Sequence, residues 1–300
     1  HARRPARPRR SLRLNLEGWA FVAPATIVVL GLTLFPAGWS FVLSLQRWNG
    51  FSDPEWIGTR NYAYAVTDPD LGGAVLHTVV YTALFVPSSV LLGLLLATAL
   101  NRRIRFIGIY RTAIFAPFVA SAAATGILAS YLFSPQFGLI NNILRRLGLP
   151  PQGWLEDPHQ AMVVIAIMSL WGSAAFTTVI FLAALQDIPG ELVEAARIDG
   201  ATSGQAFRNV VVPQLAPVIV FATIWQVIQS LQLFDLVYTT TRGGPLNATE
   251  TVVYYLWNAA FRNTQFGYGS AVAWTLFLVT LVITLAIVLV TRRSSKIEAF

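Results

Sequence analysis

The sequence predicts an all-α fold, that of a polytopic membrane protein with six transmembrane helices. Apolar residues make up 55% of the 300 residues and charged residues only 12%, whereas soluble domains carry about 25% charged residues. The apolar residues gather in long runs, each near or above the roughly 20 residues that a helix needs to cross the hydrocarbon core. The six expected spans are residues 19–45, 75–100, 112–133, 161–185, 215–236 and 271–290.

Both ends of the chain are polar. Arginines within residues 1–18, interrupted by Pro5 and Pro8, predict a basic cytoplasmic tail without fixed structure. The apolar run that follows has 27 residues, which is too long for the roughly 7–15-residue core of a signal peptide. We therefore expect a retained first span, a membrane domain over residues 19–292 and a second short tail over residues 293–300.

The distribution of basic residues predicts the orientation. With the N-terminus inside the cell, the inner segments hold 15 of the 21 Lys and Arg residues and the outer segments hold six. Basic residues concentrate on the cytoplasmic side of membrane proteins, so we expect a multi-pass protein of the cytoplasmic membrane with both termini inside. Because topology accounts for the net charge of +7, we expect no nucleic-acid partner.

One outer segment has a helical pattern of its own. Between the last two spans, Val252, Leu256 and Ala260 recur at the spacing of one helix face. This pattern predicts an amphipathic helix over residues 249–261, lying on the membrane or on a partner.

The spans lack the residues that drive transport. Their only ionisable side chains are His77 and Asp235, both near the outer ends. Proton-driven carriers normally keep a charged group deep in the membrane, so this pattern disfavours a self-sufficient secondary carrier. The chain also has no GxxxxGK[ST] sequence for ATP, no cysteine, and no grouping typical of a metal or catalytic centre. We expect neither an enzyme nor a metal site, but a transport component that takes its energy from a partner.

The fifth span is the expected solute pathway. At 100° per residue, Trp225, Gln229 and Gln232 share one face with Phe221, and Gln226 lies at its edge. Aromatic rings pack on the C–H faces of neutral, hydroxyl-rich solutes, and amides pair with their hydroxyls. The alternative is that the glutamines bond to a neighbouring helix.

The fourth span offers a second polar face. Ser169, Ser173 and Thr177 lie on one side of that helix together with Phe176 and could line the same cavity. The alternative is that these hydroxyls bond back to carbonyls of their own helix. No Arg or Lys lies on either face, so a phosphate-bearing solute would need a cation from elsewhere.

The polar segment 187–213, between the fourth and fifth spans, predicts a helix–turn–helix hairpin. Asp187 can cap a first helix with Pro189 in its first turn, Gly200 permits a sharp turn, and Ser203 can cap a second helix. A connector needs only about 4–6 residues. The greater length favours a docking element for a soluble partner over a simple connection.

Within this hairpin, a run of residues resembles the EAA signature of permease subunits of binding-protein-dependent ABC importers. The signature has the form EAA-x3-G-x9-I-x-L-P, and Val210 and Val212 replace its Ile and Leu. The residues that carry it are Glu194, Ala195, Ala196, Gly200, Val210, Val212 and Pro213. Further motifs towards the C-terminus, such as Gly243-Gly244-Pro245, resemble maltose-type sugar permeases.

The resemblance implies the type I importer permease fold and a set of partners. These are a second permease subunit, with a different chain favoured, an ATP-binding subunit dimer, and an extracytoplasmic solute-binding protein. ATP and Mg²⁺ would be bound by the ATPase, and this chain would bind no cofactor. It would form half of the pathway for a sugar or sugar-like solute, or for a glycerol-phosphate derivative as the alternative.

By position, the resemblance also implies the residues that contact the ATPase. Glu194, Ala195, Ala196 and Gly200 would form the docking core. The full set expected at this contact is Glu191, Glu194, Ala195, Ala196, Arg197, Asp199, Gly200 and Pro213.

Overall fold

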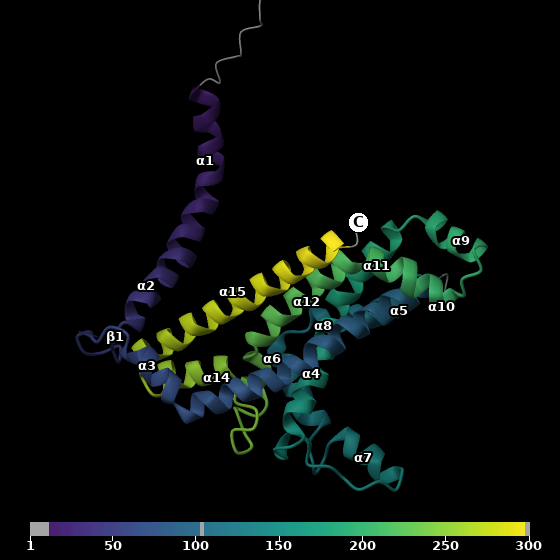
Figure 1. The fold of residues 1–300 in the computed structure, drawn as a ribbon. Helices are drawn as coiled ribbons and strands as arrows, with labels where there is room; N and C mark the ends of the chain where they lie inside the picture. Colours follow the sequence, from purple (N-terminus) through teal and green to yellow (C-terminus); the bar gives the residue numbers. More distant parts are fainter. Residues whose placement is uncertain (1–11, 103–104, 298–300) are drawn as a thin grey trace, which may run out of the picture.

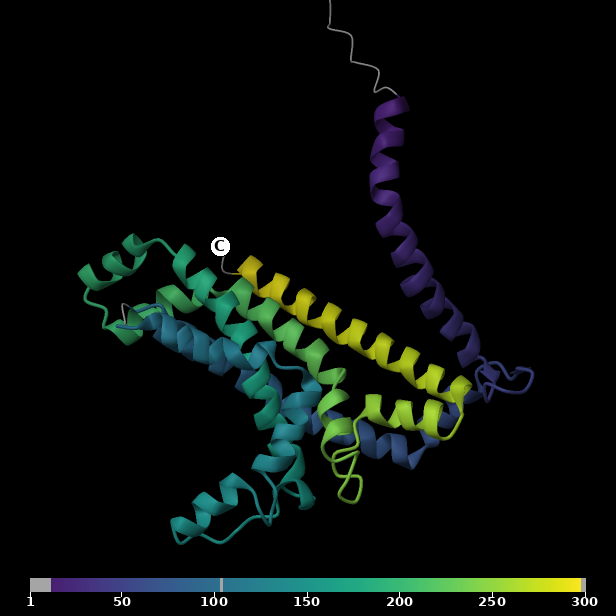
Figure 2. The same ribbon diagram turned by 180° about the vertical axis from the view of Figure 1, so that it is seen from behind.

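A computed structural model describes residues 12–102 and 105–297, with side chains described for 19–102 and 105–291. Most of the expected basic tail, residues 1–11, lies outside the described residues, as do residues 298–300. The structure is a bundle of long helices with short helices at both ends (Figures 1 and 2). Within the described residues, five helices are long and apolar enough to cross a membrane, or six if one bent pair forms a single span. The five are Trp19–Ser44, Pro69–Leu100, Ala161–Asp187, Ala216–Thr239 and Phe266–Thr291.

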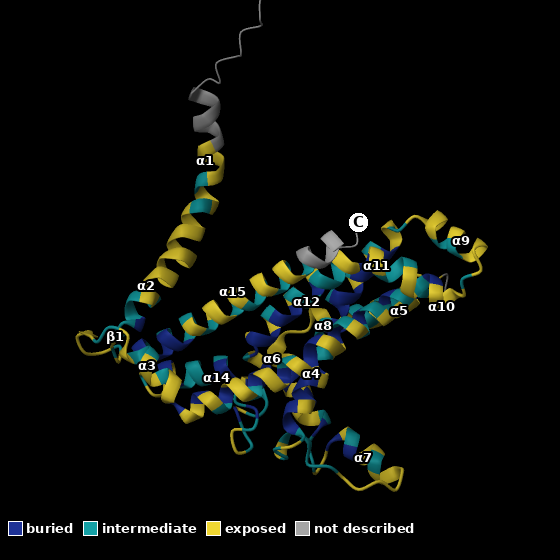
Figure 3. Cartoon of the chain, in the orientation of Figure 1, coloured by how far each residue is buried: buried dark blue, intermediate teal, exposed yellow. Residues whose placement is uncertain are grey.

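The first span stands away from the bundle. It is built from α1 (Leu12–Val29), a π-helical turn η1 (Leu30–Leu34) and α2 (Phe35–Ser44). Pro36 has no N–H to donate into the preceding turn, which accounts for a π-helical turn at this point. None of its apolar window is buried within this chain, and Figure 3 shows mainly exposed residues along α1 and α2. This surface is therefore free to meet lipid or another protein.

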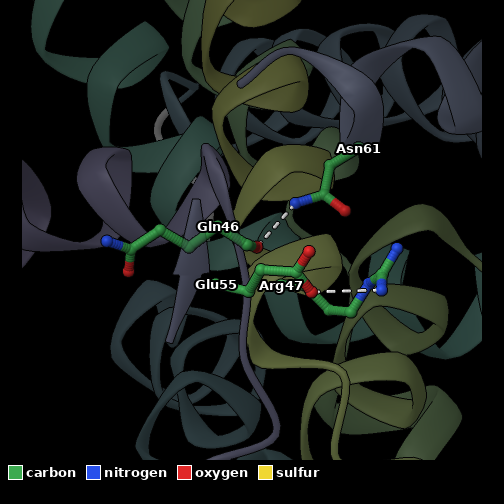
Figure 4. A network of polar contacts seen from close by, with 4 residues as sticks. All are labelled: Gln46, Arg47, Glu55 and Asn61. Carbon is green, nitrogen blue, oxygen red and sulfur yellow. Dashed lines mark hydrogen bonds and ion pairs between the residues drawn. The ribbon is translucent and has the colours of Figure 1, made fainter. Parts of the chain in front are cut away.

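A small hairpin follows the first span. β1 (Gln46–Arg47) pairs antiparallel with β2 (Glu55–Trp56), and an exposed ion pair of 3.2 Å joins Arg47 to Glu55. Asn61, in α3 (Arg60–Thr67), donates through Nδ2 to the carbonyl of Gln46 at 2.9 Å (Figure 4). These contacts fix the chain as it enters the next span.

Two long helices form the centre of the bundle. They are α4 (Pro69–Leu100) and α8 (Ala161–Asp187), which pack along much of their length. They approach closely at Gly93, where a Cβ would lie 2.5 Å from Cβ of Thr177. The core residues gather around α4, α8 and α12 (Ala216–Leu231).

The expected third span, residues 112–133, is not one continuous helix. The structure has α5 (Ile107–Val119) and α6 (Ala122–Leu132), bent by 103° at the break between them. Ala120 and Ser121 adopt extended conformations, and the Ser121 side chain caps α6 by accepting from the Ala124 amide. The small residues there offer little packing to hold a straight helix, and serine favours the cap position.

The segments that connect the spans form further short helices. The amphipathic segment 249–261 contains α14 (Val252–Trp257), capped by Thr251, and the π-helical η4 (Asn258–Arg262). These elements pack on the final helix, α15 (Phe266–Ile297). The others are α7 (Leu139–Arg146), the 3₁₀ turn η2 (Trp154–Glu156) and α13 (Asp235–Thr239).

A buried carboxylate joins three of these elements. Asp68 caps α4 and also accepts hydrogen bonds from the hydroxyls of Tyr255 and Tyr268. Burial raises the pKa of Asp68, but these hydrogen bonds outweigh it and hold that pKa below its usual value. The charged carboxylate therefore stabilises the end of the bundle at which α4 begins.

Candidate functional site

The first candidate site is a cavity of about 460 Å³ between α4, α5, α8 and α12. Small-molecule sites in proteins are typically about 300–1,000 Å³. The lining combines aromatic rings with amides and hydroxyls. The residues are Tyr81, Phe85, Phe118, Ser169, Gly172, Ser173, Phe176, Trp225, Gln226 and Gln229.

Three of the residues expected on the fifth span line this cavity. Trp225 lies against Phe176 with ring centroids 5.0 Å apart, and Gln229 is exposed beside it. Gln226 is 1% exposed, and its Nε2 donates to the hydroxyl of Ser89 in α4. Both alternatives therefore apply to Gln226, because it hydrogen-bonds to a neighbouring helix and also borders the cavity.

Gln232 lies outside the cavity, contrary to the expectation. α12 ends at Leu231 and Gln232 lies in the turn that follows. The helix that would place Gln232 on the same face as Trp225 therefore ends one residue before Gln232. Phe221, on the same stripe, does not line the cavity either.

On the fourth span, two of the three expected hydroxyls reach the cavity. Ser169 and Ser173 line it, while each also donates to a carbonyl of its own helix, at 2.9 and 3.4 Å. Thr177 does not line the cavity, because it is 0% exposed and fills the space at Gly93 where α4 crosses α8. Its hydroxyl bonds the carbonyls of Ser173 and Ala174.

Three aromatic lining residues, Tyr81, Phe85 and Phe118, are not among the expected residues, whereas Phe176 lies on the expected face of the fourth span. Tyr81 and Phe85 stack on each other along α4, with centroids 5.3 Å apart, and Phe118 and Phe176 complete the wall. The i, i+4 spacing of Tyr81 and Phe85 indicates a shared face, but nothing in the sequence says which helix that face meets. Polar residues within an apolar span, as in the fifth span, indicate a cavity-facing surface more clearly than aromatic residues do.

The cavity is neutral. No Asp, Glu, Lys, Arg or His is among its lining residues. No group of three or more His, Cys, Asp or Glu residues that could hold a metal ion occurs in the part of the chain that the structure describes. The lining is thus suited to hydroxyl-rich, uncharged ligands, and it supplies neither an acid–base pair nor a metal.

The second candidate site is the polar hairpin between α8 and α12. Its first helix, α9 (Gly190–Ile198), ends in a left-handed turn at Gly200, where φ is +86°. The amide of Ala201 donates to the Ala196 carbonyl at 2.9 Å, and that of Gly200 to the Arg197 carbonyl at 3.1 Å. This pair of bonds defines a Schellman motif, which satisfies the last carbonyls of the helix.

The caps of the hairpin differ from those expected. α8 continues through Asp187, and Pro189 rather than Asp187 is the N-cap of α9. Ile188 is extended because the residue before a proline avoids the helical region. Thr202, not Ser203, caps α10 (Ser203–Ala206) and forms a capping box with Gln205. The hairpin closes through η3 (Phe207–Val211) and α11 (Val212–Gln214).

Most of the residues expected at the ATPase contact lie on α9 and the turn that follows it, whereas Pro213 lies in α11 at the end of the hairpin. α9 packs only on other parts of its own hairpin among the described elements with substantial contacts, and it projects from the end of the bundle (Figures 1 and 2). Ile198 beside them is 85% exposed. All eight are exposed except Ala196, which is partly buried: Glu191, Glu194, Ala195, Ala196, Arg197, Asp199, Gly200 and Pro213.

Comparison with known proteins extends these observations. Residues 89–296 match the family model described as "Binding-protein-dependent transport system inner membrane component". The lactose transport system permease protein LacF of Rhizobium radiobacter is 38% identical over 276 residues, which cover 90% of this chain and 92% of that protein. The sn-glycerol-3-phosphate transport system permease protein UgpA of Agrobacterium fabrum is 33% identical over 271 residues, covering 89% of this chain and 91% of that protein.

Among solved structures, the chain is similar to part of a bacterial alginate ABC transporter in complex with an alginate pentasaccharide-bound periplasmic protein. The TM-score is 0.84 at 20% sequence identity, and the match covers 97% of this chain and 99% of that chain. At this identity the likeness concerns the fold alone. It confirms the all-helical membrane fold expected from the sequence.

Proposed function

The chain belongs to the family of inner membrane components of binding-protein-dependent transport systems, and we propose that it forms half of the pathway by which such an importer takes up a neutral sugar or polyol. The neutral, aromatic and amide-lined cavity carries this proposal. Rings such as Trp225 and Phe176 would pack on the C–H faces of the solute, and the amide of Gln229 would bond to its hydroxyls. A relative named for lactose transport supports the same class of solute.

A glycerol-phosphate derivative is the second candidate. The relative named for sn-glycerol-3-phosphate transport favours it. Against it stands the absence of Arg, Lys and His from the cavity lining, since phosphate recognition normally uses cationic side chains or helix N-termini. The second permease would have to supply the cation.

Energy would reach the pathway through α9. The exposed hairpin carries the EAA residues, and its Schellman turn at Gly200 would hold Glu194, Ala195 and Ala196 in one orientation towards a groove of the ATPase. ATP and Mg²⁺ would be bound and hydrolysed there, and movement of the ATPase dimer would shift the two permeases between inward- and outward-facing states. This chain would itself bind no cofactor.

The remaining partners and the orientation follow from the same proposal. A second permease, favoured to be a different chain, would cover the open side of the cavity, and an extracytoplasmic binding protein would deliver the solute. Both termini and α9 would lie in the cytoplasm, as the excess of basic residues on that side indicates.

The decisive experiment measures ATPase activity of the assembled importer in lipid nanodiscs. A panel of sugars, polyols and glycerophosphodiesters is tested, each with the cognate binding protein and again without it. We expect stimulation by one or a few neutral, hydroxyl-rich solutes, dependent on the binding protein. Stimulation by phosphate-bearing solutes alone would replace the first candidate with the second, and uptake by this chain alone in ATP-free vesicles would overturn both.

A further inference from the structure

A second pocket, of about 530 Å³, lies at the end of the bundle that carries α9. Its described lining comes from the end of α4, the start of α5 and the last turn of α8. It is separate from the solute cavity and shares no residue with it. Its lining includes Leu100, Arg102, Arg105, Ile107, Arg111 and Gln186.

The positive charge of this pocket is uncompensated in the part of the chain that the structure describes. No Asp or Glu lines the pocket, and the ion pair found among the described residues joins Arg47 to Glu55, at the other end of the bundle. Nε of Arg111 is buried and has no hydrogen-bond partner among the described residues. Three guanidinium groups line the pocket with no carboxylate among them, an arrangement that favours an acceptor carrying negative charge.

The grouping of three guanidinium groups favours a phosphate group as the ligand. Three guanidinium groups on one pocket can offer several N–H donors to the oxygens of one anion, and arginine recognises phosphate by paired donors of this kind. Gln186 adds a neutral amide at the rim. The first turn of α5 adds backbone N–H groups, since its N-cap residue, Phe106, provides no side-chain cap.

Apolar neighbours distinguish a lipid from a free anion. Leu100 and Ile107 belong to the lining, and Phe106, Ile109 and Tyr110 are exposed on the adjoining surface of α5. The pocket also lies where two membrane spans end, at Leu100 and Asp187. This is the depth at which phospholipid headgroups meet acyl chains, and basic pockets between transmembrane helices bind anionic headgroups there.

We propose that this pocket binds the phosphate group of an anionic phospholipid, with the acyl chains lying along the exposed apolar face of α5 (Figure 3). Gln186 is followed within a few residues by the start of α9 at Gly190. The bound headgroup therefore steadies the base of the hairpin. This inference goes beyond the proposed transport function and concerns a separate site.

The test measures lipid retention by the purified full-length chain in detergent, using native mass spectrometry. Phosphatidylglycerol and phosphatidylcholine are compared, and inorganic phosphate is added as a competitor. Because the readout is lipid binding by this chain, it does not depend on transport or on ATP. We expect preferential retention of phosphatidylglycerol, undiminished by millimolar phosphate.

The variants are R102Q/R105Q and R111Q. Because the side chains of Arg102 and Arg105 are exposed, we expect their replacement to leave the fold intact. Each should weaken retention of phosphatidylglycerol by roughly ten- to a hundredfold, because each loses charge-assisted hydrogen bonds. The matched control is R145Q/R146Q on α7, an exposed arginine pair at the opposite side of the bundle, which should retain the lipid like the wild type.

Three results would overturn the inference. They are equal retention of both lipids, unchanged retention in R102Q/R105Q, and displacement of the lipid by inorganic phosphate, which would indicate a free-anion site. Loss of ATPase association in R102Q/R105Q with normal lipid retention would assign the arginines to a protein contact instead.

Discussion

Replacing Gly200 with valine should weaken the association of the permease with its ATPase. Gly200 has φ of +86°, and a Cβ built there would meet nothing within 4 Å. The substitution therefore introduces no clash and acts through the backbone alone. A non-glycine residue held in the left-handed region costs about 1–3 kcal/mol, and a β-branched residue lies at the upper end because its side chain crowds the backbone.

That free energy must be supplied whenever α9 adopts the docking turn. The two Schellman hydrogen bonds, from Ala201 to Ala196 and from Gly200 to Arg197, are the contacts that break when the turn relaxes. If only the turn seen here fits the ATPase, affinity should fall by about 5- to 150-fold. Asn tolerates the left-handed region better than valine, so Gly200→Asn should lose much less.

The measurement is the binding of purified ATPase to the permease pair in nanodiscs, together with uptake in proteoliposomes. Gly204→Ala is the matched control, because Gly204 lies four residues away in α10, with no positive φ and with open space around it. Membrane insertion should be the same in all variants. Wild-type affinity and uptake in Gly200→Val would refute the proposed coupling role of this turn.

Three further predictions concern other parts of the chain. Trp225→Ala and Gln229→Ala should each raise KM for uptake by roughly 2- to 10-fold, because each removes a ring contact or a hydrogen bond to the solute. The control variants Trp171→Ala and Gln232→Ala lie outside the cavity and should leave KM unchanged. Unchanged kinetics in both Trp225→Ala and Gln229→Ala would contradict the assignment. Gly93→Ala should destabilise the bundle by about 1–3 kcal/mol through overpacking against Thr177, measured as a lower Tm. The control Gly72→Ala lies in the same helix with open space around it and should leave the Tm unchanged or raise it. Equal Tm values for the two variants would show that the α4–α8 contact adjusts to the added methyl group. Burial raises the pKa of Glu250 above its usual 4.5 despite a hydrogen bond from Asn258, so the folded state favours the protonated form and loses stability as pH rises through the folded pKa. Glu250→Gln should therefore have a higher Tm than the wild type at neutral pH, with the difference closing below about pH 4.5; a difference independent of pH would argue against this titration.

Long-range apolar patterning was enough to predict most of the architecture. Five expected spans correspond to long apolar helices, and the amphipathic segment beside α15 contains helix where Val252 and Leu256 indicated it. Burial in hydrocarbon imposes a simple requirement on such segments, because every backbone group must bond within the helix. The sequence records that requirement as a run of apolar residues.

Local competition between caps and packing was harder to predict. Asp187 and Ser203 are good capping residues, yet the flanking geometry set by Pro189 and the Thr202–Gln205 box places the caps elsewhere. At the site, helical periodicity identified Trp225, Gln226 and Gln229 but also Thr177, which the crossing at Gly93 requires for packing. Periodicity gives the face of a helix, whereas the identity of the facing helix comes only from the fold.

The bend between α5 and α6 restricts what can surround this chain in the membrane. At Ala120 and Ser121 the helical hydrogen bonding is interrupted, and both residues, like Val119 at 86% exposure, are uncovered by the rest of the chain. Acyl chains offer no donors or acceptors, so lipid alone is an unsuitable neighbour for interrupted backbone at membrane depth. The break must therefore face protein or water, and this side of the molecule is one that the bilayer alone does not complete.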